Sequence, residues 1–238
     1  MNASQIQDFI IENTASYERL NSIISIGRSG RWRRWVARRA VQKPGARVLD
    51  IFSGTGPVGL EAAALGAQVT VAGNSPQLLK IAGRKADSLG LNIDLKEANL
   101  SKGIALFTKE SFDAITFALG IRYHEHPEAI FSRLFSLLKP GGRLVVLEYV
   151  VPSGGPASKL ASLYFFRLLP LAASVASKHK QLFTQLSCST KALGHEEDLE
   201  LMLLSAGFNI LEVQPLAFGL VYGVVATRGF GRRFDAIA

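Results

Sequence analysis

The sequence predicts an α/β fold with a doubly wound, mostly parallel sheet. Three observations indicate this class. Short apolar runs alternate with helical patterns over residues 46–150. The first run, Arg47–Phe52, leads through a glycine-rich turn directly into a helix. The chain has 238 residues, of which 48% are hydrophobic, so it can bury a full core and is not a disordered protein.

Seven strands and their connecting helices account for most of this Rossmann-like arrangement. Ser75 and Pro76 form the N-cap and N1 pair that starts a helix. The run Arg143–Val150 is almost wholly apolar, as expected of a strand buried on both faces. We expect strands at 47–52, 68–72, 91–96, 112–118, 143–150, 209–214 and 220–227, and helices at 58–65, 76–89, 127–138 and 196–206.

The sequence predicts one domain with an N-terminal cap, an inserted helical region and a C-terminal tail. Residues 1–43 form an N-terminal helical cap that belongs to the same domain, and residues 44–228 form its main body. A proline- and glycine-rich break at 152–156 precedes an apolar helical region, 157–186, inserted after strand five. Arg167 and Pro170 argue against a membrane-spanning helix there, which leaves an interfacial helix, a lid over an apolar pocket, or ordinary core packing. Residues 229–238 form a short basic tail.

The composition combines positive charge with apolar character. The net charge is +8 and the mean hydropathy is +0.20, which points first to an anionic membrane surface and second to nucleic acid. A single cysteine, Cys188, excludes a disulfide framework and a cysteine-based zinc site. The N-terminus shows no secretory signal, so we expect a cytoplasmic protein, with peripheral attachment to the inner face of the membrane as an option.

The segment from Gly27 to Lys43 holds seven basic residues and no acid. Trp32, Trp35, Val36 and Ala40 follow helical spacing and form one apolar stripe, while Arg31, Arg34 and Arg38 follow another face. A solvated basic face, a membrane-surface patch and a nucleic-acid patch all remain open, and we expect the tryptophans to pack rather than to stack on bases.

The glycine-rich turn is Asp50-Ile-Phe-Ser-Gly-Thr-Gly-Pro-Val-Gly59. Glycines let the backbone approach a ligand closely, and the helix that follows offers its N–H groups. A nicotinamide enzyme needs an acid or an arginine after the second strand, and Val71–Ser75 contains neither. A methyltransferase needs an acid near the loop to face the methionine amino group of its cofactor, and Asp50 suits that role.

Other segments favour the methyltransferase. Ala98-Asn-Leu100 follows strand three, and Phe112-Asp113 opens strand four. Leu137-Leu-Lys-Pro-Gly-Gly-Arg-Leu-Val-Val-Leu-Glu148 forms a helix end, a turn and strand five, and Ser205-Ala-Gly-Phe208 precedes strand six. In these segments the chain resembles class I S-adenosylmethionine-dependent methyltransferases.

A narrower resemblance rests on two further motifs. Tyr17-Glu-Arg-Leu-Asn21 and Ser25-Ile-Gly27, followed by Arg31-Trp32, are similar to the N-terminal signature of the ubiquinone/menaquinone biosynthesis C-methyltransferase family. Ala118-Leu-Gly-Ile-Arg122 is similar to that family's strand-four motif. The resemblance spans residues 17–227 and implies S-adenosyl-L-methionine as cofactor and a lipophilic aromatic or quinol acceptor.

The resemblance also implies which residues form the site, and it implies that the site holds no metal. The expected cofactor contacts are Tyr17, Asp50, Ser53, Gly54, Thr55, Gly56, Gly73, Asn74, Asn99, Leu100 and Ala118. Gly73 stands where the family has the ribose-binding acid, and Ser29 and Gly30 replace a His-Arg pair. A lost charged hydrogen bond at Gly73 weakens cofactor binding unless Asn74 compensates.

The expected catalytic residues follow strand four. Arg122 stays protonated and is expected to stabilise a phenolate or to position a water. His124 and His126 are candidate bases, because histidine titrates in the useful range, or else they are surface histidines. Two alternatives remain open, namely a soluble secondary-metabolite acceptor and a degenerate fold that binds a ligand without methyl transfer. Nucleic acid is the least favoured partner, and the oligomeric state is left open.

Overall fold

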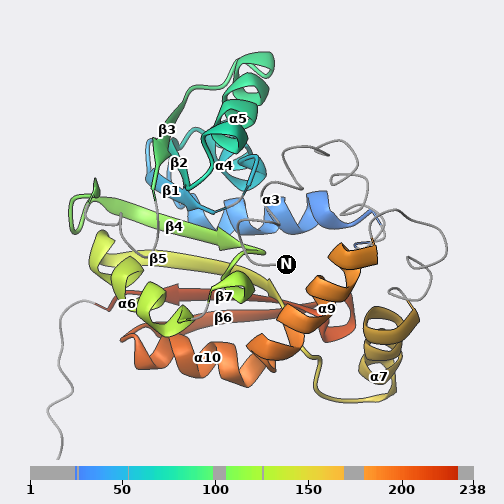
Figure 1. Ribbon diagram of the computed structural model, residues 1–238. Helices are drawn as coiled ribbons and strands as arrows, with labels where there is room; N and C mark the ends of the chain where they lie inside the picture. Colours follow the sequence, from blue (N-terminus) through green and yellow to red (C-terminus); the bar gives the residue numbers. More distant parts are fainter. Residues whose placement is uncertain are drawn as a thin grey trace, which may run out of the picture.

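One seven-stranded sheet organises the chain (Figure 1). The computed structural model describes residues 25, 27–52, 54–98, 106–124, 126–168 and 180–229. Within them the strand order is β3-β2-β1-β4-β5-β7-β6, with β7 antiparallel to both of its neighbours. The strands are β1 (Arg47–Ile51), β2 (Gln68–Gly73), β3 (Ile93–Glu97), β4 (Phe112–Ala118), β5 (Leu138–Tyr149), β6 (Asn209–Leu216) and β7 (Val221–Thr227). The predicted doubly wound, mostly parallel sheet is therefore confirmed.

Helices cover both faces of the sheet. One apolar core joins the sheet to α3 (Ser29–Ala40), α4 (Pro57–Ala64) and α5 (Pro76–Ser88). The other joins it to α6 (Pro127–Leu137) and α10 (Glu196–Ser205). Alternate residues of β1, such as Val48 and Leu49, enter opposite cores, because successive side chains of a strand point to opposite faces.

Helix α3 packs through the predicted apolar stripe. Trp32, Val36 and Ala40 are buried, and Trp35 lies against Gly223 of β7, where a Cβ would approach the indole ring to 2.6 Å. Arg31, Arg34 and Arg38 are not buried and form the opposite face. The tryptophans therefore pack in the core, as predicted.

Strand β5 begins earlier than predicted. It starts at Leu138 rather than at residue 143, and α6 ends at Leu137. The pairing with β4 shifts register between Phe112 and Ala114, so a bulge absorbs the Lys-Pro-Gly-Gly turn within the strand. Gly141 supplies the positive φ of 76° that this bulge contains.

The inserted region is divided. Its described residues form α7 (Pro156–Leu163), a π-helical turn η3 (Tyr164–Leu168) and α9 (Lys180–Leu193), which runs past residue 186, where the sequence predicted the region to end. Two short 3₁₀ turns, η2 (Ile121–Tyr123) and η4 (Ala217–Gly219), follow β4 and precede β7. In the described part of the chain, no helix is both long and apolar enough to cross a membrane.

Candidate active site

The glycine loop lies at the carboxyl end of β1, between the strand and α4. Gly54 and Gly56 have positive φ angles of 65° and 71°. A Cβ on Gly56 would lie 3.1 Å from Ala82, whereas a Cβ on Gly54 would meet nothing within 4 Å. Gly56 is therefore required for packing, and Gly54 borders open space that a ligand can enter.

Asp50 braces this loop from inside the protein. Its side chain is fully buried, and its carboxylate accepts hydrogen bonds from the Gly59 N–H at 2.7 Å and from the Thr116 hydroxyl at 2.7 Å. These bonds connect β1 to the start of α4 and to β4. The geometry gives Asp50 a supporting position beneath the loop, and its direct contact with a cofactor stays a prediction.

Two more hydrogen bonds tie the loop to its neighbours. The Lys85 ammonium of α5 donates to the Thr55 hydroxyl at 3.0 Å, so that side chain is held by the protein itself. The Phe52 N–H donates to the Ala72 carbonyl at 2.8 Å, which fixes the loop against β2. The loop is therefore preorganised by contacts with three elements.

The end of β2 offers room where the ribose-binding acid is expected. A Cβ on Gly73 would meet nothing within 4 Å, and Gly73 does not have a positive φ. Asn74 is half-buried beside it, and Ser75 caps α5 by accepting a hydrogen bond from the Leu78 N–H at 3.3 Å. The N-cap prediction is confirmed, and the space at Gly73 can hold a larger side chain.

An aromatic cluster surrounds His124. Its ring centroid lies 5.4 Å from that of Phe52 and 6.2 Å from that of Phe117, both in edge-on contact. Phe52 has a positive φ of 57°, a strained conformation that is characteristic of functional sites. Gly120 is required here, because a Cβ would approach the Phe117 ring to 2.8 Å. Burial lowers the pKa of His124, so the imidazole is neutral near pH 7.

Arg122 and Glu148 form a buried ion pair beside this cluster. Their side chains are 3% and 0% exposed. The Tyr149 N–H also donates to Glu148 at 2.8 Å, and the Arg122 guanidinium lies 5.3 Å from the Tyr149 ring centroid. Burial raises the pKa of Glu148, while the charge of Arg122 and the hydrogen bonds oppose that rise. Glu148, at the end of β5, therefore faces Arg122 inside the protein.

The inserted region packs on this pair through Tyr149. Phe165 of η3 is fully buried and stacks on the Tyr149 ring at 5.2 Å, and Trp32 of α3 contacts the same ring edge-on at 6.4 Å. The Ser187 hydroxyl of α9 donates to the Phe165 carbonyl at 3.3 Å. The inner side of the insertion therefore forms part of the core next to Arg122.

Most of the predicted site residues meet at one end of the sheet. The carboxyl ends of β1, β2 and β4 bring together Asp50, Gly54, Thr55, Gly56, Gly73, Asn74, Ala118, Arg122 and His124. His126 is exposed at the N-cap of α6. Tyr17, Ser53, Asn99 and Leu100 lie outside the described residues.

Sequence reasoning missed several contributors. Thr116 carries a detectable signal, since it is the polar residue in the middle of an apolar strand. Phe52 and Phe117 carry none, because an aromatic residue in a strand is normally core. The role of Tyr149 is visible only in the structure, where its ring lies between Arg122 and the insertion.

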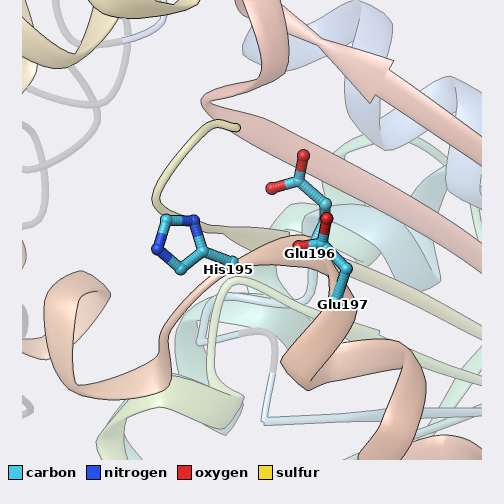
Figure 2. Close-up of side chains that lie close together, drawn as sticks. All are labelled: His195, Glu196 and Glu197. Carbon is cyan, nitrogen blue, oxygen red and sulfur yellow. The ribbon is translucent and has the colours of Figure 1, made fainter. Parts of the chain in front are cut away.

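A second cluster lies at the start of α10 (Figure 2). Ligand atoms of His195, Glu196 and Glu197 lie within 4.8 Å of one another. The three residues are consecutive and none is buried, and Glu196 accepts hydrogen bonds from the Ser153 N–H at 3.3 Å and from its hydroxyl. The cluster caps a helix N-terminus and is separate from the glycine loop.

The family model and the curated relatives show the class, which is an S-adenosylmethionine-dependent methyltransferase. The sheet resembles that in the crystal structure of a SAM dependent methyltransferase from Aquifex aeolicus, with a TM-score of 0.57, 18% identity, and coverage of 82% of this chain and 88% of the other. The chain belongs to the ubiE/COQ5 methyltransferase family, which it matches over residues 1–228.

Curated relatives match most of the chain. The demethylmenaquinone methyltransferase of Thermus thermophilus is 37% identical over 207 residues, covering 86% of this chain and 92% of the relative. The ubiquinone/menaquinone biosynthesis C-methyltransferase UbiE of Shewanella sediminis is 30% identical, covering 87% of this chain and 84% of the relative. The resemblance stated from the sequence is confirmed.

Proposed function

We propose that the chain transfers a methyl group from S-adenosylmethionine to a ring carbon of a lipophilic quinol acceptor. The relatives named above act in menaquinone and ubiquinone biosynthesis, which supports this acceptor class over a soluble secondary metabolite or binding without transfer. The observation that carries the proposal is the placement of a neutral histidine, two aromatic rings and a buried arginine next to the glycine loop.

The glycine loop fits the cofactor. Gly54 and Gly73 both face space that a side chain would otherwise fill, and Asp50 holds the loop in place. When bound, S-adenosylmethionine supplies an electrophilic methyl group. The protein then contributes mainly alignment and proton handling.

The residues after β4 are assigned to the acceptor. His124 accepts the proton of the acceptor hydroxyl, because burial favours the neutral form of the imidazole. The ring carbon that gains the methyl group then loses its own proton to the ionised oxygen, so one proton is released overall and His124 holds it. Arg122 remains protonated and orients the ionised oxygen, while Glu148 and Tyr149 fix the guanidinium in place. His126 is exposed, which makes it the weaker candidate for the base.

Restoring the acid at the end of β2 is expected to tighten cofactor binding. A charged hydrogen bond is worth about 1.5–3 kcal/mol, so Gly73→Asp should lower the Kd for S-adenosylhomocysteine about ten- to hundredfold. The open space at Gly73 accepts the new side chain without strain. Calorimetric titration measures the effect, and Gly73→Asn, which adds the same shape without charge, should give a smaller gain. Unchanged or weaker binding by Gly73→Asp would show that this position does not face the ribose.

We also propose that the protein lies in the cytoplasm and binds peripherally at the inner face of the membrane. The exposed side of α3 carries Arg31, Arg34 and Arg38, and α3 contains no acid. Such a face is attracted to anionic lipid headgroups. The acceptor, a lipophilic quinol, is held in the same bilayer.

Methyl transfer to a quinol tests the proposed function directly. The full chain is titrated with S-adenosylhomocysteine and then incubated with S-adenosylmethionine and a reduced demethylmenaquinone in detergent. We expect a product one methyl group heavier, whose NMR signal belongs to a methyl on ring carbon. Binding without product would favour the ligand-binding alternative, and an O-methyl product would overturn ring C-methylation.

A further inference from the structure

Exposed apolar side chains gather at one corner of the molecule. Leu160 and Leu163 of α7, Leu168 of η3 and Phe218 of η4 are 66%, 42%, 48% and 64% exposed. We refer to these four residues as the α7 patch. Their spacing along α7 and η3 follows a helical face, widened by the π-helical turn.

The two parts of the chain that form the α7 patch are packed against each other. The Ser158 hydroxyl of α7 donates to the Phe218 carbonyl at 3.0 Å. A Cβ on Gly219 would lie 3.2 Å from Pro152, which precedes α7. Turn η4 therefore packs directly against the start of the insertion.

The α7 patch lies at the end of the sheet that carries the active site. Tyr149, at the carboxyl end of β5, pairs with Val221, at the start of β7. Both connections that form the patch therefore leave the sheet at the same end as the glycine loop. Figure 1 shows α7 beyond the end toward which the β4 and β5 arrows point.

The protein does not use this patch as core. None of the residues of α7 is buried, although the helix has an apolar face. Ala217 and Phe218 both have positive φ angles, 47° and 58°, which are strained for these residue types. This strained turn presents a phenylalanine outward, and exposed apolar clusters of this kind mark interaction surfaces.

The charges around the α7 patch identify its partner. Lys159, Arg167 and Lys191 are exposed on α7, η3 and α9. The sequence from Tyr149 to His195 contains no aspartate or glutamate. The acids that border this stretch, Glu148 and Glu196, are engaged by Arg122 and Ser153. Exposed apolar side chains with basic residues on the same and neighbouring elements suit the headgroup region of an anionic bilayer, where long basic side chains reach the lipid phosphates.

We propose that the α7 patch inserts into the interfacial region of an anionic lipid bilayer. This proposal rests on the proposed function in one respect. A quinol acceptor dissolved in that bilayer would lie close to the end of the sheet that holds the active site. The patch supplies the apolar contact, which the basic face of α3 lacks.

Vesicle sedimentation of the full chain tests this surface. The wild type is compared with Leu160→Ser/Phe218→Ser on vesicles of phosphatidylglycerol mixed with phosphatidylcholine and on pure phosphatidylcholine. The control is Leu201→Ser/Leu204→Ser on α10, which removes two other exposed leucines, 60% and 50% exposed, from outside the patch. Because the variant removes two large apolar side chains from the lipid contact, we expect its partition coefficient on anionic vesicles to fall about tenfold or more. The control should bind like the wild type.

Three results would overturn the assignment. The first is equal binding to anionic vesicles by the α7-patch variant and the wild type. The second is an equal loss of binding by the Leu201→Ser/Leu204→Ser control. The third is a patch-dependent dimer that does not bind lipid. Titration of each variant with S-adenosylhomocysteine separates these results from failure of the proposed function. A patch variant that binds this ligand normally has kept its active site whatever its affinity for vesicles.

Discussion

Replacing Glu148 with alanine is expected to lower the free energy of unfolding by about 3–5 kcal/mol, because the change leaves Arg122 buried without its counter-charge. Both side chains are almost completely removed from solvent, so water cannot take over the role of the carboxylate. The Tyr149 N–H also loses its acceptor. Denaturant unfolding followed by circular dichroism measures the loss, with S-adenosylhomocysteine absent so that binding does not mask it.

The double variant Arg122→Met/Glu148→Leu separates the ion pair from simple packing. It removes both charges and keeps the volume, so it should recover most of the stability that Glu148→Ala loses. It should nevertheless lack methyl transfer, since Arg122 is assigned to the acceptor oxygen. A Glu148→Ala protein with wild-type stability would show that the pair does not hold the end of β5 against η2.

The sheet was predictable because its signals are local. Apolar runs, glycine turns and the Ser75-Pro76 cap each depend on a few neighbouring residues, and β1, β2 and β4 were placed to within two residues. The start of β5 was wrong, because a Pro-Gly-Gly turn normally ends a structure and here it forms a bulge within a strand. Helix α9 runs beyond residue 186, because the sequence after Pro170 contains no glycine or proline that would end a helix before Gly194.

The site was predictable where a motif fixes the backbone, and less so where long-range packing decides. The glycine loop and Arg122 follow from their motifs. The bracing of Asp50 by Thr116 joins residues 66 positions apart, and no local pattern encodes it. The positive φ of Phe52 likewise follows from how the loop packs on β2 and Gly120. Sequence reasoning could not choose between His124 and His126, whereas their different burial in the structure separates them.

Replacing His124 with glutamine is expected to reduce kcat about 10²- to 10⁴-fold, the range that a positioned general base contributes. Glutamine retains polarity and approximate size but cannot take a proton. His124 is partly buried beside Phe52 and Phe117, and this burial lowers its pKa because it disfavours the charged form of the imidazole. The matched control is His126→Gln, two residues away at an exposed position, and it should reduce kcat less than twofold.

The pH profile of the wild type gives an independent test of the same assignment. The pKa of His124 is lowered from 6.5 by burial, so kcat should be flat from pH 7 upward and should fall only below 6.5. The contribution of His124 to the free energy of unfolding changes with pH in the same direction as kcat. The unfolded chain binds the proton more readily, so stability is complete above 6.5 and decreases as the pH falls below that value. Circular dichroism across the range therefore separates loss of the base from loss of the fold. Two results would show that His124 is not the base. One is a kcat profile that falls only above pH 7, and the other is a His126→Gln variant that is as impaired as His124→Gln.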